Sequence, residues 1–205
     1  MASFKYDNVY INKNYSIAGK YENNGILKNV NRYINDFYDD EKTIEDCEIK
    51  MQREVLNNLK CNNTELIVGG DLSNQISVSS ISEADNNISF LGVYSACASF
   101  ISSLIILANF INTNLISEGI AITSSHNLTS EKQFRFPVEY GSLRPPYSTF
   151  TSTGSVGCIV SNLKSNIKIV SSTIGNVLDM GIKDANNMGA VIAHSAVKTL
   201  IKHFP

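Results

Sequence analysis

A stripe of apolar residues predicts the first helix of this chain. Between residues 41 and 60 the apolar positions recur at steps of three and four, at Ile44, Cys47, Met51, Val55 and Leu59. This period is typical of an amphipathic helix with one buried face. Thr43 followed by Asp46 resembles a capping box, although Asp39 or Asp40 could also cap the helix.

Further apolar runs alternate with helical patterns along the rest of the chain. The runs 64–68, 88–94, 119–123, 151–160 and 166–172 predict strands, and the patterns 72–84, 97–112 and 187–203 predict helices. Gly69 and Gly70 are expected to break the first strand. The alternation predicts an α/β fold with a mostly parallel central sheet, covered on both faces because its strands are nearly all apolar.

Two segments depart from this alternation. Residues 1–38 are rich in Asn and Tyr, and we expect them to form an N-terminal arm. Residues 127–150 are polar and predict a long inserted loop, which in a compact domain is usually functional or disordered. The helix 97–112 is apolar nearly all round, which predicts that it is buried.

Composition excludes several classes of protein. The 205 residues contain 17 basic and 19 acidic side chains, a formal net charge of −2, so no basic excess exists to bind nucleic acid. The longest apolar stretch, 104–111, is too short to span a bilayer, and no secretory signal opens the chain. The four cysteines form no CxxC pair, which favours reduced thiols and a cytosolic-side compartment. We expect no metal and no cofactor.

Cys97 is the strongest candidate for a reactive side chain. It follows a short strand-to-helix turn and opens the apolar helix, where the positive end of the helix dipole stabilises a thiolate. Such a thiol could attack acyl groups. The alternative is a buried structural cysteine, since cysteine is among the most buried residue types.

Other candidates lie at the ends of the predicted strands and in the polar segment. If the strands are parallel, Asp71 and His126 share one sheet edge with Cys97, where ligands of open α/β sheets gather. Asp71 could instead cap a helix, and His126 could be a loop histidine bonded to backbone. Arg135 and Arg144 suit carboxylate binding, or pair with neighbouring glutamates.

Several strings together resemble one known family. They are 69–75 (GGDLSNQ), 91–97 (LGVYSAC), 124–141 (SSHNLTSEKQFRFPVEYG), 151–154 (TSTG), 173–175 (TIG) and 179–189 (DMGIKDANNMG). In this order and spacing, residues 36–205 resemble the stage V sporulation protein AD family of spore-forming bacteria. That family is similar to thiolases and ketoacyl synthases, which fold as two similar layered halves around buried central helices. Their nucleophile, a cysteine at the start of such a helix, corresponds to Cys97.

The resemblance implies a domain organisation. Residues 39–180 correspond to the first half of a thiolase-like fold, and 181–205 to the start of a second half. Chains of the family are much longer, so we expect most of that second half to be absent here. The apolar surface it would cover then predicts an oligomer, such as a homodimer, or a poorly stable monomer.

The resemblance also implies a function. The family binds dipicolinic acid and works with membrane proteins of the same operon to move it into the developing spore. We therefore expect a non-catalytic, peripheral protein on the cytoplasmic side of the spore inner membrane. The ligand, free or as its calcium chelate, would contact Cys97, His126, Arg135, Gln133, Asp71, Arg144 and Thr153. The alternative is an acyl-transferring condensing enzyme or thiolase with Cys97 as nucleophile.

Overall fold

A computed structural model describes residues 1–25, 28–134, 151–183 and 187–204. The helices are α1 (Ile44–Leu59), α2 (Ser77–Glu83), α3 (Ser99–Asn112), α4 (Asn127–Phe134) and α5 (Met188–His203), with short 3-10 turns η1 (Glu22–Asn24), η2 (Asn74–Ile76) and η3 (Ala96–Ala98). The strands are β1 (Ala2–Lys5), β2 (Tyr10–Ala18), β3 (Arg32–Tyr33), β4 (Leu66–Gly70), β5 (Ser89–Gly92), β6 (Glu118–Ser125), β7 (Gly154–Ser161), β8 (Ile167–Lys168) and β9 (Ser171–Ile174).

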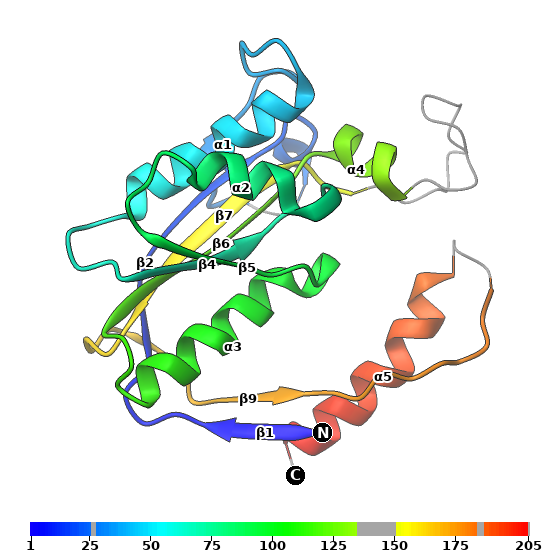
Figure 1. Ribbon diagram of the computed structural model, residues 1–205. Helices are drawn as coiled ribbons and strands as arrows, with labels where there is room; N and C mark the ends of the chain where they lie inside the picture. The colour runs from blue at the N-terminus through cyan, green and yellow to red at the C-terminus, as the bar shows by residue number, and fades with distance from the viewer. Residues whose placement is uncertain (26–27, 135–150, 184–186, 205) are drawn as a thin grey trace.

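The main sheet confirms the predicted α/β class. Its strand order is β3-β2-β7-β6-β4-β5, with β8 paired to β2. Strand β4 runs parallel to both β5 and β6, whereas β7 runs antiparallel to both β6 and β2. A separate antiparallel pair joins β1 to β9, beside α5 (Figure 1). The carboxyl ends of β2, β4 and β6 therefore lie at one edge of the sheet.

Helices cover the two faces of the sheet. In Figure 1, α1 and α2 lie on one face and α3 on the other. On β6, Ile120 and Ile122 belong to the core beneath α1, whereas Ala121 belongs to the core beneath α3. Alternate residues of a strand point to opposite faces, so these two cores fix the direction of every β6 side chain.

The start of α1 follows the capping prediction. The Thr43 hydroxyl accepts a hydrogen bond from the Asp46 amide at 3.0 Å and donates one to the Asp46 carboxylate at 2.7 Å. Two polar groups at the helix end are thereby satisfied. The amphipathic pattern of residues 41–60 is confirmed as a helix over 44–59.

The prediction that Gly69 and Gly70 break a strand is wrong, because both belong to β4. A Cβ atom at Gly69 would collide with the carbonyl oxygen of Ile122, and one at Gly70 with that of Val93. These glycines therefore allow the neighbouring backbone to approach closely, instead of ending the strand.

The N-terminal segment differs from the expected arm, since residues 10–18 form a strand within the main sheet. Strand β2 pairs with β7 from Tyr10, opposite Ser161, to Ala18, opposite Gly154. Its Asn and Lys side chains are largely exposed, and only its last residues are buried. Because one face of this strand meets solvent for much of its length, its sequence lacks a continuous apolar run.

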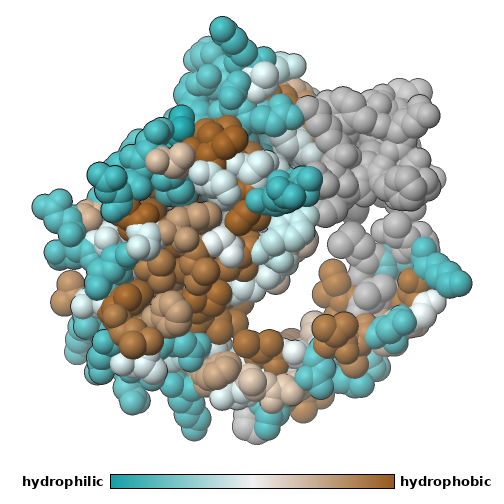
Figure 2. All heavy atoms as spheres, in the orientation of Figure 1, coloured by the Kyte–Doolittle hydropathy of each residue, from teal (hydrophilic) through white to brown (hydrophobic). Residues whose placement is uncertain are grey.

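Three helical segments also differ from their predictions. Helix α2 begins at Ser77 after a 3-10 turn, later than the predicted residue 72. Residues 127–134 form α4, in the segment predicted to be a loop. Helix α3 is buried on one face, through residues such as Leu107 and Ile111, while the Ile101 side chain is 56% exposed. Figure 2 shows apolar side chains gathered over α3 and along α5, with an open space between them.

Candidate functional site

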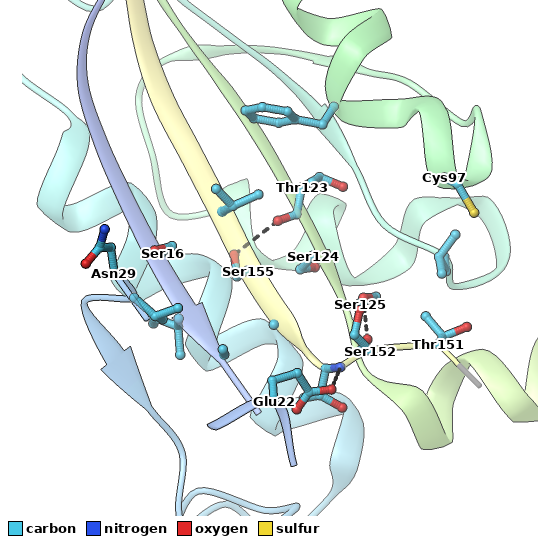
Figure 3. Close-up of a pocket in the computed structure, with 18 of the residues that line it drawn as sticks. Ser16, Glu22, Asn29, Cys97, Thr123, Ser124, Ser125, Thr151, Ser152 and Ser155 are labelled. Carbon is cyan, nitrogen blue, oxygen red and sulfur yellow. Dashed lines mark hydrogen bonds between the residues drawn. The ribbon is translucent and has the colours of Figure 1, made fainter. Parts of the chain in front are cut away.

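A cavity of about 820 Å³ opens at the sheet edge where β2 and β6 end. The ends of β2, β6 and β7 form its floor, contributing Ala18, Ser125 and Gly154, which lie opposite one another in register. The turn η3 and the start of α3 form one wall, the α3 wall. The other, the 22–30 wall, is formed by Glu22, Lys28, Asn29 and Val30. Figure 3 shows this arrangement, with Cys97 and Asn29 on opposite sides.

Cys97 lies on the α3 wall with an exposed side chain. Ala96, directly before it, has a φ of 46°, in the left-handed region that residues other than glycine rarely adopt. The Ser99 hydroxyl donates to the Ala96 carbonyl at 2.9 Å and accepts from the Ser95 amide at 3.1 Å, which holds this turn in place. The turn thus presents the thiol to the cavity, so Cys97 is not a buried structural cysteine.

Hydroxyl groups cover much of the floor, and they donate their hydrogens to the protein. Thr123 donates to the Gly70 carbonyl at 2.8 Å, and Ser125 donates to the Ser152 carbonyl at 2.7 Å. A hydroxyl that has donated its hydrogen offers only lone pairs to a further partner. These groups can therefore accept hydrogen bonds from a ligand.

Thr153, a predicted ligand contact, lines the cavity and joins two segments of it. Its amide donates to the Glu22 carboxylate at 2.8 Å, and its carbonyl accepts from the Gly19 amide at 2.8 Å. Its hydroxyl accepts from the Asn127 amide and donates to the Asn127 side chain, both at 3.0 Å. Thr153 thus connects β7 to the 22–30 wall and to α4.

Asp71, at the end of β4, does not line the cavity. Its side chain is buried, and its carboxylate accepts from the Ser73 and Ser79 amides, both at 2.7 Å. Ser79 lies in the first turn of α2, so Asp71 satisfies a free helix amide. The capping interpretation of Asp71 fits this geometry, and the ligand-contact interpretation does not.

His126 shares the sheet edge but does not line the cavity. Its ring is completely buried; Nε2 lies 2.9 Å from the Phe37 carbonyl, and Nδ1 accepts from the Leu128 amide at 3.2 Å. With Nδ1 accepting, Nε2 carries the hydrogen and donates it to Phe37, which is the neutral tautomer. His126 is a histidine bonded to backbone, as the alternative interpretation proposed.

The side chains of three predicted ligand contacts lie outside the described part of the structure. Arg135 and Arg144 lie outside the described residues. Gln133 belongs to α4, but its side chain lies outside the described part of the structure.

Sequence reasoning missed three polar residues of the 22–30 wall: Glu22, Lys28 and Asn29. They lie in a stretch without hydrophobic periodicity, and no motif marks them. Only the pairing of β2 with β7 brings this wall to the end of β6.

A buried carboxylate supports the β6 edge from the opposite face of the sheet. Glu48 of α1 is fully buried and accepts hydrogen bonds from the Ser124 hydroxyl at 2.9 Å and the Thr129 hydroxyl at 2.8 Å. The pKa of Glu48 is raised to about 7, chiefly by burial. The negative charges of Asp71 and Glu45 also raise this pKa, whereas the two hydrogen bonds lower it. Glu48 thereby connects α1, β6 and α4 behind the cavity.

Within the described residues, no helix has both the length and the apolar composition needed to cross a membrane. No group of three or more His, Cys, Asp or Glu side chains in the same part of the chain is arranged to hold a metal ion.

Solved structures of similar fold include OleA and a 3-oxoacyl-(acyl carrier protein) synthase III. OleA of Xanthomonas campestris, variant H285N, matches with a TM-score of 0.62 at 14% identity, covering 97% of this chain and 73% of its own. The 3-oxoacyl-(acyl carrier protein) synthase III, FabH, of Xanthomonas oryzae matches with a TM-score of 0.59 at 15% identity, over 97% and 73%. At these identities the likeness establishes the thiolase-like fold.

Sequence comparison is more specific. The family model of Stage V sporulation protein AD (SpoVAD) matches residues 2–205. The Stage V sporulation protein AD of Bacillus subtilis (strain 168) is 30% identical over 203 residues, which cover 96% of this chain and 60% of the relative. The chain therefore spans 60% of the length of this curated relative. With a family match over nearly its whole length and the expected fold, the chain belongs to the stage V sporulation protein AD family.

Proposed function

We propose that this chain binds dipicolinate in the cavity beside Cys97 and serves spore formation without catalysis. The observation that carries the proposal is the open cavity of about 820 Å³ at the sheet edge, in a chain of a sporulation family. Its size falls within the range of small-molecule sites, roughly 300–1,000 Å³.

The lining suits a flat aromatic diacid. Apolar side chains such as Phe100 and Val156 offer surfaces against which a pyridine ring can pack. Polar groups surround them on the floor and on the 22–30 wall. Two charge-assisted contacts of about 2 kcal/mol each sum to about 4 kcal/mol, which corresponds to binding in the millimolar range, and packing of the ring offsets part of the cost of immobilisation.

The proposal includes a location and partners. We infer a peripheral protein on the cytoplasmic side of the spore inner membrane, acting with membrane proteins of the same operon. Titration with free dipicolinate and titration with its calcium chelate determine which of the two forms the chain binds.

Isothermal titration of the 205-residue chain with dipicolinate tests the proposal. We expect saturable binding, which Val156→Trp abolishes by filling the floor of the cavity. Leu163→Trp is the matched control, because Leu163 is 61% exposed and does not line the cavity. Absence of saturable binding to the parent chain, or equal binding by both variants, would contradict the proposal.

A second function is favoured by the exposed thiol of Cys97 on its left-handed turn. In acyl transfer the Cys97 thiolate would attack the carbonyl carbon of a coenzyme A thioester, forming a new thioester as the coenzyme A thiolate leaves. No described histidine lines the cavity to exchange protons in a later step. We therefore rank this function second.

Mass spectrometry after incubation with acetyl-coenzyme A separates the two functions. The acyl-transfer function requires one added acetyl group, lost in Cys97→Ser. The binding function expects an unmodified chain.

A further inference from the structure

The donors available to an anionic ligand are unevenly distributed around the cavity. On the floor, the hydroxyl hydrogens of Thr123 and Ser125 are both donated to backbone carbonyls. A carboxylate accepts hydrogen bonds and cannot donate them. These hydroxyls, which can also only accept, therefore form no hydrogen bond with it. A carboxylate of the ligand therefore needs other donors, such as the Thr151 and Ser152 hydroxyls or a cation in the lining.

Only two charged side chains line the cavity among the described residues, and both belong to the 22–30 wall. The Glu22 carboxylate already accepts the Thr153 amide at 2.8 Å. Lys28 is exposed and forms neither an ion pair nor a side-chain hydrogen bond with any described residue. Its ammonium group is thus an available cation at the cavity.

Asn29 follows Lys28 in the sequence and also lines the cavity. Its side chain is drawn on the wall opposite Cys97 in Figure 3, and its amide group also has no hydrogen-bond partner within the described structure. Lysine contributes a compact charge with three donors, and the Asn29 amide contributes two more. Both residues therefore offer hydrogen-bond donors to a carboxylate group in the cavity.

We propose that Lys28, assisted by Asn29, binds a carboxylate group of the ligand and gives the cavity its preference for anions. This inference rests on the proposed function for the identity of the diacid. It assigns charge recognition to the 22–30 wall, and it leaves the Cys97 wall to contact the ring.

Titration of charge variants with dipicolinate tests the assignment. We expect Lys28→Gln to weaken binding about tenfold and Lys28→Arg to retain most of it. Lys20→Gln is the matched control, since it removes the same charge from an exposed lysine nearby that does not line the cavity. Asn29→Ala should weaken binding about threefold.

Salt supplies a second readout. Added sodium chloride should weaken binding by the parent chain more than by Lys28→Gln, because the screened interaction is missing in the variant. Urea midpoints equal to that of the parent chain show that each variant is folded.

Two failures are distinguishable in this experiment. If the parent chain binds dipicolinate and Lys28→Gln binds within twofold of it, the Lys28 assignment is overturned while the proposed function stands. If the parent chain shows no saturable binding, the proposed function itself is overturned.

Discussion

The four cysteine side chains lie in two contrasting environments. Cys47 and Cys158 are buried in the two cores, and burial raises the pKa of each thiol to about 12. Cys61 and Cys97 are exposed, and the Cys61 thiol donates to the Glu118 carboxylate at 2.8 Å. Reactivity of a thiol depends on exposure and on access to its thiolate form.

We expect iodoacetamide to label Cys61 and Cys97 in the folded chain and to leave Cys47 and Cys158 unlabelled. Dipicolinate should slow the labelling of Cys97 alone, because Cys61 lies outside the cavity lining. Peptide mass mapping measures all four rates in one sample. Equal protection of Cys61 and Cys97 would indicate a general effect of the ligand instead of binding in the cavity.

Glu48 makes the free energy of unfolding depend on pH. Its folded-state pKa of about 7 lies above the usual glutamate pKa of 4.5, because burial penalises the charged carboxylate. The group therefore contributes most stability below about pH 4.5, and this contribution is lost as pH rises through 7. The difference corresponds to at most about 3 kcal/mol.

Glu48→Gln should remove this part of the pH dependence while keeping a group that can bond Ser124 and Thr129. Urea unfolding between pH 5 and pH 8 measures it. Glu83, whose pKa burial also raises to about 7, leaves a residual slope of the same sign. Glu41→Gln on the surface is the control, and a parent-like slope in Glu48→Gln would contradict the assignment.

At the scale of the element, glycines mark where backbones approach one another. Gly69→Ala places a Cβ against the Ile122 carbonyl of the neighbouring strand, so a strand must shift. We expect a loss of roughly 2 kcal/mol or more in the free energy of unfolding. Gly189→Ala is the matched control, because nothing lies within 4 Å of its added Cβ and alanine favours its helix α5. Urea denaturation that shows equal effects would contradict this interpretation.

The elements also show what the sequence could predict. The amphipathic stripe of residues 44–59 and the Thr43 cap were predictable, because the period and the cap are local signals. Strand β2 was not, because its burial depends on β7, which lies more than a hundred residues later in the chain.

Some residues of the candidate site could likewise be predicted from the sequence, and others could not. Cys97 could be predicted to open into it, since a strand-to-helix turn has a local signature. Lys28 and Asn29 could not, because only tertiary pairing brings their segment to the cavity. His126 shares the expected sheet edge, but its orientation toward Phe37 follows from a contact that no sequence pattern records.

At the scale of the whole molecule, apolar surface remains uncovered. Ile101 of α3 is 56% exposed and Ile201 of α5 is 67% exposed. Surfaces of this kind favour association. We therefore expect the chain to self-associate with rising concentration.

Sedimentation velocity measures this association. Ile101→Lys and Ile201→Lys should each shift it toward monomer without lowering the urea midpoint, because both side chains are already largely in solvent. Lys13→Gln serves as a charge control away from both helices. A chain that remains monomeric at every concentration would contradict the expectation.

The most direct measurement is a crystal structure of the chain soaked with dipicolinate. Our account predicts the pyridine ring in the cavity beside Cys97, with one carboxylate group within hydrogen-bond distance of the Lys28 Nζ atom. Dipicolinate bound at another place, with the cavity empty although binding in solution is saturable, would contradict it.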